Sequence, residues 1–235
     1  MTFSDTITNL GILQRARKLA RVDSTQWATA DVVGSCNDYL DKIFNYGFSL
    51  HKKFNLDDSN HTKLPIGTTN LVLDQSYYSF LTDEQGNRIV NITRVEIGDI
   101  NLTQIDERDI NDVTLANYLS VAGKPIEYDK VADNIIRIYP KSDVNTTAGI
   151  TYYFQRAPSY FTASDTTKEP GIPASLHRGF VVKAAYDIAL ALGLPNVNIL
   201  ALEAEKEWQE VVKEFKVRTA GDKALILETD YLDSR

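Results

Sequence analysis

The sequence predicts an α+β protein: a helical bundle formed by the N- and C-terminal segments, with an inserted antiparallel β domain and an extended C-terminal tail. Apolar residues recur every three or four positions in the first part of the chain, and this pattern returns after residue 159. Between them lie short β-rich runs separated by turn residues. A helical end of about 50 residues has a marginal core on its own. We therefore expect residues 1–56 and 159–220 to share one core, with 57–158 as the inserted domain and 221–235 as a docking tail.

Two helices are predicted in the first segment. Ser4 or Asp5 could cap a helix that runs to about Val22, with an apolar side made by Ile7, Leu10, Leu13 and Leu19. After a polar break at 23–25, a long amphipathic helix follows. Its apolar face consists of Val33, Cys36, Leu40, Ile43, Gly47, Leu50 and Phe54.

The middle segment reads as strands joined by short turns. The β-rich runs are 70–73, 88–97, 102–105, 125–128, 135–139 and 150–154. Period-two alternation is clearest for Ile136 and Ile138, and again for Ile150, Tyr152 and Phe154. No helical pattern connects these runs, which favours an antiparallel sheet or a small barrel. Residues 109–120 fit either a helical turn or an extended loop.

Helical periodicity returns near Pro173, which suits a first helical turn, and it is interrupted at Gly193. A last helix starts at Asn198 and should end at Gly221. One face of this helix carries Leu200, Ala204, Trp208, Val211 and Phe215. The following tail contains the apolar run 224–227, which is a poor fit for a disordered end and suggests docking.

Composition limits the function classes. The 235 residues include 25 Lys+Arg against 32 Asp+Glu, a formal charge of -7 that disfavours a generally basic nucleic-acid binder. Cys36 is the single cysteine and there are three histidines, so neither a disulfide nor a multi-cysteine or histidine-rich metal centre is expected. No apolar run is long enough to span a membrane, and the start is too polar for a signal peptide.

The search for chemistry yields one acidic cluster. Asp106, Glu107 and Asp109 surround Arg108 and could form a divalent-cation site or an acid/base pair, but the stretch lacks the glycine that such loops usually need. A charged turn or a subunit contact is the simpler interpretation. Cys36 lies on an apolar helix face, which indicates a packed thiol. The sequence therefore predicts no catalytic, metal or cofactor site.

Two sets of side chains suggest binding instead. Arg15, Arg17, Lys18 and Arg21 form the one concentrated positive cluster, which could meet phosphates, an acidic protein patch or only solvent. An aromatic set could stack on bases, although alternation along the strand assigns at least half of it to core or interface. This set is Tyr152, Tyr153, Phe154, Tyr160 and Phe161.

The stretch 152–194 resembles head-to-tail adaptor (neck) proteins of tailed bacteriophages, and most closely those beneath the portal of short-tailed phages. The resemblance rests on YYFQRAPSYF (152–161), TTKEPGIP (166–173), LHR (176–178), AAYD (184–187) and ALGLPN (191–196). The opening RKLAR (17–21), NDYLDK (37–42) and IRIYP (136–140) are similar too. These are structural signatures with no catalytic motif among them.

The resemblance implies a structural virion protein, not an enzyme, at the head–tail junction. It implies a ring of typically twelve copies that continues the DNA channel, with DNA passing through and no specific binding to it. Partners would be other copies, the portal protein, and tail nozzle, tube or fibre proteins. The tail would reach the portal, so the candidate portal-docking residues are Ala224, Leu225, Ile226, Leu227 and Tyr231.

Two other functions stay open at this point. One is a different neck or tail-completion component with the same organisation. The other is a cell-wall or glycan hydrolase that uses the carboxylates of Asp106, Glu107 and Asp109.

Overall fold

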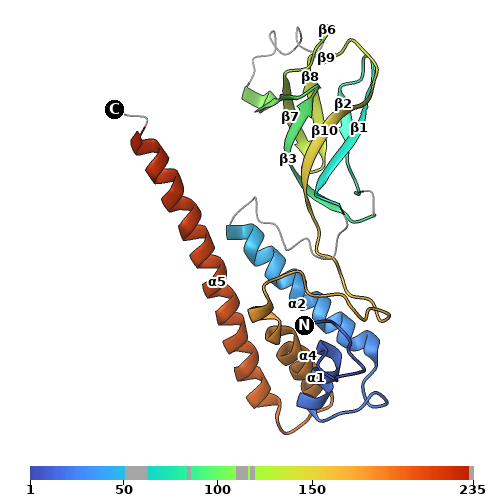
Figure 1. The fold of residues 1–235 in the computed structure, drawn as a ribbon, viewed down its shortest axis with the longest axis vertical. Helices are drawn as coiled ribbons and strands as arrows, with labels where there is room; N and C mark the ends of the chain where they lie inside the picture. Colours follow the sequence, from blue (N-terminus) through green and yellow to red (C-terminus); the bar gives the residue numbers. More distant parts are fainter. Residues whose placement is uncertain (51–62, 84–85, 110–115, 117–119, 233–235) are drawn as a thin grey trace. The chain divides into compact units, whose positions relative to one another are not determined.

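The chain folds into two compact units (Figure 1). Unit 1 combines Met1–His61 with Pro158–Arg235, and unit 2 is Thr62–Ala157. The computed structural model describes residues 1–50, 63–83, 86–109, 116 and 120–232, with the side chains of 109 and 218–232 left out. The mixture of helices with a mainly antiparallel β unit confirms the predicted α+β class.

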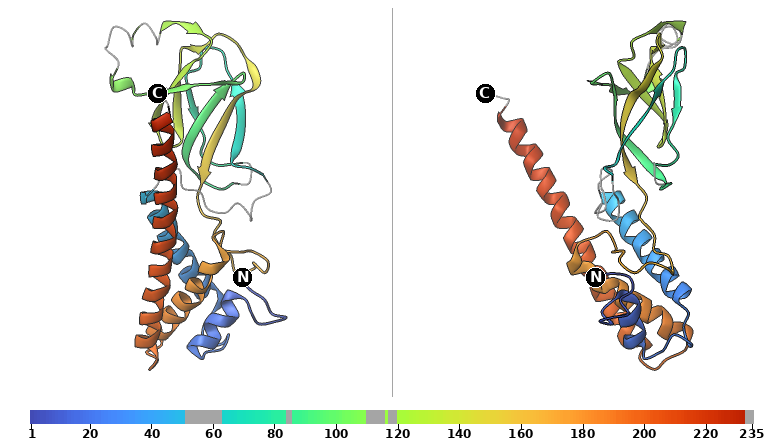
Figure 2. Two further views of the ribbon diagram at one scale, coloured as in Figure 1. Left: turned by 60° about the vertical axis from the view of Figure 1, so that its left-hand side comes forward. Right: turned by 45° about the vertical axis from the view of Figure 1, so that its right-hand side comes forward.

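Unit 1 is a helical bundle around α4 (Arg178–Ala191), which contacts α1 (Ile12–Ala20), α2 (Thr29–Leu50) and α5 (Val197–Leu232). A short 3-10 turn, η2 (Ala174–Leu176), precedes α4. Figure 2 shows α1, α2, α4 and α5 as neighbouring rods. Both chain ends supply one core, with its largest fully buried side chains Phe3, Ile12, Leu40, Ile43, Phe180 and Ile188.

The first helix starts later than predicted. Asp5 does not cap it; its carboxylate accepts the backbone N–H groups of Ile7 and Thr8 at 3.0 Å and closes a local turn. The carbonyls of Thr2 and Phe3 accept the N–H groups of Ile12 and Leu13 at 3.0 and 2.9 Å, so the preceding segment caps the helix. Two residues predicted on the apolar side are consequently exposed, Ile7 and Leu10.

The last helix continues beyond its predicted end. Gly221 was expected to stop it and to begin an extended tail, but α5 passes through this glycine to Leu232. An interior glycine weakens a helix by about 1 kcal/mol relative to alanine without breaking it. The flanking residues Thr219, Ala220, Asp222 and Lys223 include no proline, so this cost does not end the helix.

Unit 2 consists of two four-stranded sheets and a small two-stranded one. The first sheet has the order β1 (Ile66–Leu71), β10 (Thr146–Arg156), β3 (Ile89–Ile97), β4 (Ile100–Asn101). The second has the order β2 (Tyr77–Ser79), β8 (Ile135–Tyr139), β7 (Glu127–Ala132), β5 (Thr103–Ile105). Both contribute to one core that includes Ile92, Val95, Ile136, Ile138 and Ile150.

Two strand pairs depart from the predicted antiparallel pattern. β5 runs parallel to β7, and β6 (Ala122–Gly123) runs parallel to β9 (Lys141–Ser142). Four strands of two or three residues were not predicted (β2, β4, β6 and β9), because such runs are too short to show period-two alternation. A 3-10 turn, η1 (Glu107–Asp109), opens the stretch left undecided between 109 and 120, most of which lies outside the described residues.

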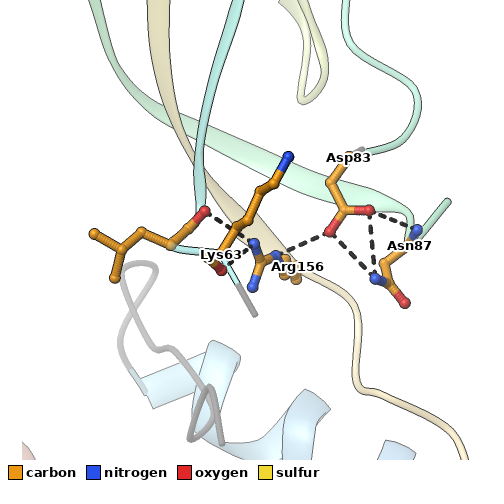
Figure 3. Close-up of polar contacts among 5 residues, drawn as sticks. Lys63, Asp83, Asn87 and Arg156 are labelled. Carbon is orange, nitrogen blue, oxygen red and sulfur yellow. Dashed lines mark hydrogen bonds and ion pairs between the residues drawn. The ribbon is translucent and has the colours of Figure 1, made fainter. Parts of the chain in front are cut away.

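A buried ion pair joins Arg156, near the end of unit 2, to Asp83 in its interior (Figure 3). Arg156, near the end of β10, places its Nε 3.0 Å from Oδ2 of Asp83, and both side chains are almost fully buried. Its Nη2 donates to the carbonyls of Lys63 and Leu64 at 2.8 and 2.9 Å. Asp83 also accepts the backbone N–H of Asn87 at 2.8 Å. One guanidinium therefore links the segment entering the unit, the strand leaving it and the 83–87 turn.

Candidate functional site

The acidic cluster proposed as a cation or acid/base site is divided between different partners. Asp106 accepts the Nε and Nη2 of Arg108 at 3.0 and 2.7 Å, and these hydrogen bonds lower the pKa of its carboxyl group. The side chain of Asp109 lies outside the described part. Among the described residues, no group of three or more His, Cys, Asp or Glu side chains could hold a metal ion.

Glu107 makes its contacts with β8, whereas Asp106 pairs with Arg108. Its carboxylate accepts both hydrogen bonds of Arg137 Nη1 at 2.9 Å and the hydroxyl of Tyr139 at 2.7 Å. Burial, followed by the hydrogen bond to Glu107, raises the pKa of Tyr139, so its hydroxyl remains a donor. The guanidinium of Arg137 also lies over the ring of Tyr77, 4.9 Å from its centroid. These contacts tie η1 to the sheet, which is a structural role.

The single cysteine and one of the three histidines, His177, are buried. Cys36 is fully buried on α2, as expected of a packed thiol, and burial raises its pKa to about 12. His177 is also buried, with Nε2 2.8 Å from the carbonyl oxygen of Ile172. His51, His61 and the acidic pair 57–58 lie outside the described residues. A thiol held neutral at physiological pH is a poor nucleophile.

The aromatic set serves mainly as core, as alternation predicted for at least half of it. Tyr152 and Phe154 belong to the core of unit 2, and Phe161 to that of unit 1, where it stacks on Phe3 with ring centroids 5.0 Å apart. Tyr160 is exposed, but its hydroxyl donates to Asp41 at 2.6 Å. Tyr153 is half-buried, and its hydroxyl donates to Glu96 at 3.2 Å. Three of the five side chains are therefore core residues, and the other two are hydrogen-bonded to carboxylates within the chain.

A groove in unit 1 collects basic side chains over an apolar floor. Its volume is about 550 Å³, and α1, α4 and α5 contribute to its lining. Arg15, Lys18 and Arg21 are exposed along one side. The floor and rim carry apolar side chains, namely Leu19, Val181, Val182, Ile199 and Leu200. The lining of this groove is therefore both basic and apolar.

The basic residues that line the groove differ from the cluster that the sequence suggested. Arg17 leaves it, because its Nη2 donates to the carbonyl of Trp27 at 2.8 Å and holds the connection between α1 and α2. Arg178 joins it from α4, but its Nε and Nη2 lie 3.0 and 3.6 Å from carboxylate oxygens of Glu207 and Glu203. Sequence spacing could not show this regrouping, because Arg178 is distant along the chain.

A second candidate surface is the later part of α5. Phe215 is the last α5 side chain that the described part places in the core, and its ring lies 6.4 Å from that of Tyr46. Seventeen further residues of α5 follow, 216 to 232, and in Figure 1 they extend past the other helices of unit 1. The five candidate docking residues lie on this stretch, at positions whose side chains are outside the described part: Ala224, Leu225, Ile226, Leu227 and Tyr231.

Among the described candidates for chemistry, the carboxylates of Asp106 and Glu107, the thiol of Cys36 and the ring of His177 are thus all engaged or buried within the fold. Among the described helices, none is both long and apolar enough to cross a membrane.

The family model of the SU10 adaptor protein matches residues 2–225, nearly the whole chain. The chain belongs to this family and is a bacteriophage adaptor, a structural protein of the virion. No curated protein matches it.

Proposed function

We propose that this chain forms a ring that joins the portal to the tail and continues the DNA channel, in the manner of the adaptors of short-tailed phages. Family membership supports the adaptor role. The number of copies, twelve, comes from the resemblance alone. The partners are other copies, the portal protein and tail nozzle, tube or fibre proteins.

The observation that carries the proposal is the length of α5. A helix rises about 1.5 Å per residue, so residues 216–232 add about 25 Å beyond the last described core contact at Phe215. The sequence of this stretch contains the apolar run 224–227. An apolar segment on a helix that extends past its own bundle is suited to binding another protein. We assign this binding to the portal.

The charge of the chain fits a conduit that does not bind DNA tightly. The formal charge is -7, and tight protein–DNA binding depends on the neutralisation of phosphates by Lys and Arg. Lysines added at positions that face the channel should slow genome release, and an unchanged ejection rate would contradict this part of the proposal.

Mass photometry with the portal protein tests the function. The wild-type chain should add a ring-sized mass to the portal, and a chain lacking 222–235 should not. The unfolding midpoint of this truncated chain should stay close to wild type, and its helical signal should fall only in proportion to the α5 residues removed. The matched control lacks only 233–235 and should still bind. A wild-type chain that ignores the portal would refute the proposal and favour a different neck or tail-completion component.

A further inference from the structure

We infer that the basic groove of one copy binds the acidic outer face of α2 on the next copy. This inference rests on the proposed ring and names its subunit contact. The outer face of α2 is defined here as the exposed positions Ala30, Asp31, Gly34 and Asp38.

The groove has positive charge that its own unit leaves unbalanced. Arg15 and Lys18 are three residues apart on α1, so they lie on the same face of the helix, and Arg21 follows at its end. Within the described part of the chain, no ion pair joins these three side chains to a carboxylate. Only Arg178 is neutralised there, by Glu203 and Glu207.

The outer face of α2 has the opposite charge. Asp31, Gly34 and Asp38 follow one another at steps of three and four, so they share one exposed stripe. The two neighbouring charges are already engaged elsewhere: Asp41 accepts the hydroxyl of Tyr160, and the Nζ of Lys42 lies 3.9 Å from the ring centroid of Trp208. Asp31 and Asp38 therefore remain as the unengaged charges of this stripe among the described contacts.

The shapes of the two surfaces also correspond. A Cβ added at Gly34 would meet nothing within 4 Å, so the backbone of α2 is open to close approach there. Ile199 lines the groove and Leu202 lies three residues further along α5; they are 63% and 75% exposed. An interface would cover these apolar side chains while it pairs the charges.

A protein partner fits the groove better than DNA does. The lining includes apolar side chains such as Val181 and Ile199, which a protein surface can cover and a phosphate backbone cannot. We assign the two surfaces to different neighbours, so that each copy uses its groove towards one neighbour and its α2 face towards the other, which is a head-to-tail pairing. Such a contact generates a ring when the rotation between copies closes.

Reciprocal charge reversal tests the inference. One variant carries Arg15→Glu and Lys18→Glu, and the other carries Asp31→Lys and Asp38→Lys. Each alone places like charges against each other and should self-associate roughly a hundredfold more weakly than wild type. Mixed in equal amounts, the two restore both kinds of contact and should assemble in alternation. Sedimentation velocity, with and without the portal protein, measures both results.

A matched control reverses two exposed lysines of α5 that belong to neither surface and precede the stretch assigned to the portal, Lys206→Glu and Lys213→Glu, and should assemble like wild type. Circular dichroism verifies that every variant is folded. Self-association of either reversed variant at wild-type strength, or no assembly of the folded mixture, would overturn the inference. Loss of DNA binding with unchanged assembly would also overturn it. Wild-type chain that forms no ring even with the portal would refute the proposed function itself.

Discussion

Arg156 connects three parts of unit 2 through one buried guanidinium. Arg156→Ala would leave the carboxylate of Asp83 buried without its ion pair and the carbonyls of Lys63 and Leu64 without their donor. Removal of one partner from a buried ion pair costs about 3–5 kcal/mol. We expect the free energy of unfolding of unit 2 to fall by this amount in urea titrations.

The control for this prediction is Arg94→Ala. Arg94 pairs with Glu96 on the same unit, but its side chain is 51% exposed, so its loss should cost at most about 1 kcal/mol. Equal effects of the two substitutions would mean that the contacts of Arg156 are not what stabilises the unit.

Because the thiol of Cys36 is buried, the free energy of unfolding should decrease as the pH rises into the alkaline range. Its folded pKa is about 12, whereas an unfolded thiol ionises near about pH 8.5, so folding favours the protonated thiol. This contribution is complete below the unfolded pKa and declines as pH rises towards 12, by up to about 1.4 kcal/mol per pH unit. Cys36→Ala should therefore show a flatter loss of stability above pH 9. In the native wild type, iodoacetamide should not modify the thiol at pH 8.

Within the helices, alanine substitutions at two glycines should have opposite effects on the free energy of unfolding. Gly179 on α4 and Gly34 on α2 are both helical, and alanine has the better helix propensity at each. A Cβ at Gly179 would lie 2.5 Å from the hydroxyl oxygen of Tyr39, whereas one at Gly34 would meet nothing. Gly34→Ala should raise the free energy of unfolding by about 0.5–1 kcal/mol. Gly179→Ala should lower it by about 1–3 kcal/mol; thermal unfolding measures both.

The packing of α5 depends on Trp208. Its ring lies 5.5 Å from that of Tyr46 and 6.3 Å from that of Tyr39, with Lys42 over its face. Trp208→Ala should cost about 3–5 kcal/mol in chemical unfolding of unit 1. Val217 lies on the same helix and is 65% exposed, so Val217→Ala should change the unfolding midpoint little. A stable Trp208→Ala variant would show that these ring contacts contribute little.

The periodicity of apolar residues correctly predicted those helices and strands that are long enough to show the pattern more than once. Ile136 and Ile138 alternate as expected and are fully buried, and Leu200, Val211 and Phe215 line the core face of α5. The start of α1 could not be predicted in this way. The segment that caps it is held by a hydrogen bond from the N–H of Phe3 to the carbonyl of Lys168, a partner far along the chain.

For the candidate surfaces too, residues close in the sequence could be predicted to lie together, whereas those brought together by the fold could not. Arg15, Lys18 and Arg21 were recognised together because they follow one another within α1 and its end. Arg17 fits that spacing equally well, but its guanidinium turns to Trp27 and Thr29. The apolar floor from Val181 and Ile199 comes from helices that only the fold brings to α1.

For the whole molecule, the division into two units predicts how fragments behave. Unit 2 is continuous in sequence and has its own core, so residues 62–157 should fold alone and keep the buried pair of Arg156 and Asp83. The first 61 residues should not fold alone. The core side chains of α1 and α2 pack with those of α4 and α5, which follow unit 2 in the chain.

The decisive whole-molecule prediction replaces unit 2 by a short flexible linker. Because the core of unit 1 is supplied by both chain ends, residues 1–61 joined to 158–235 should form one helical unit with a single cooperative unfolding transition. Trp208 lies at the junction of α2 and α5, so in a variant whose other tryptophan is replaced, Trp27→Phe, its fluorescence reports whether the two ends have met. Circular dichroism and Trp208 fluorescence should therefore change together in urea. Separate transitions, or no helical signal, would mean that unit 1 needs unit 2 in order to fold.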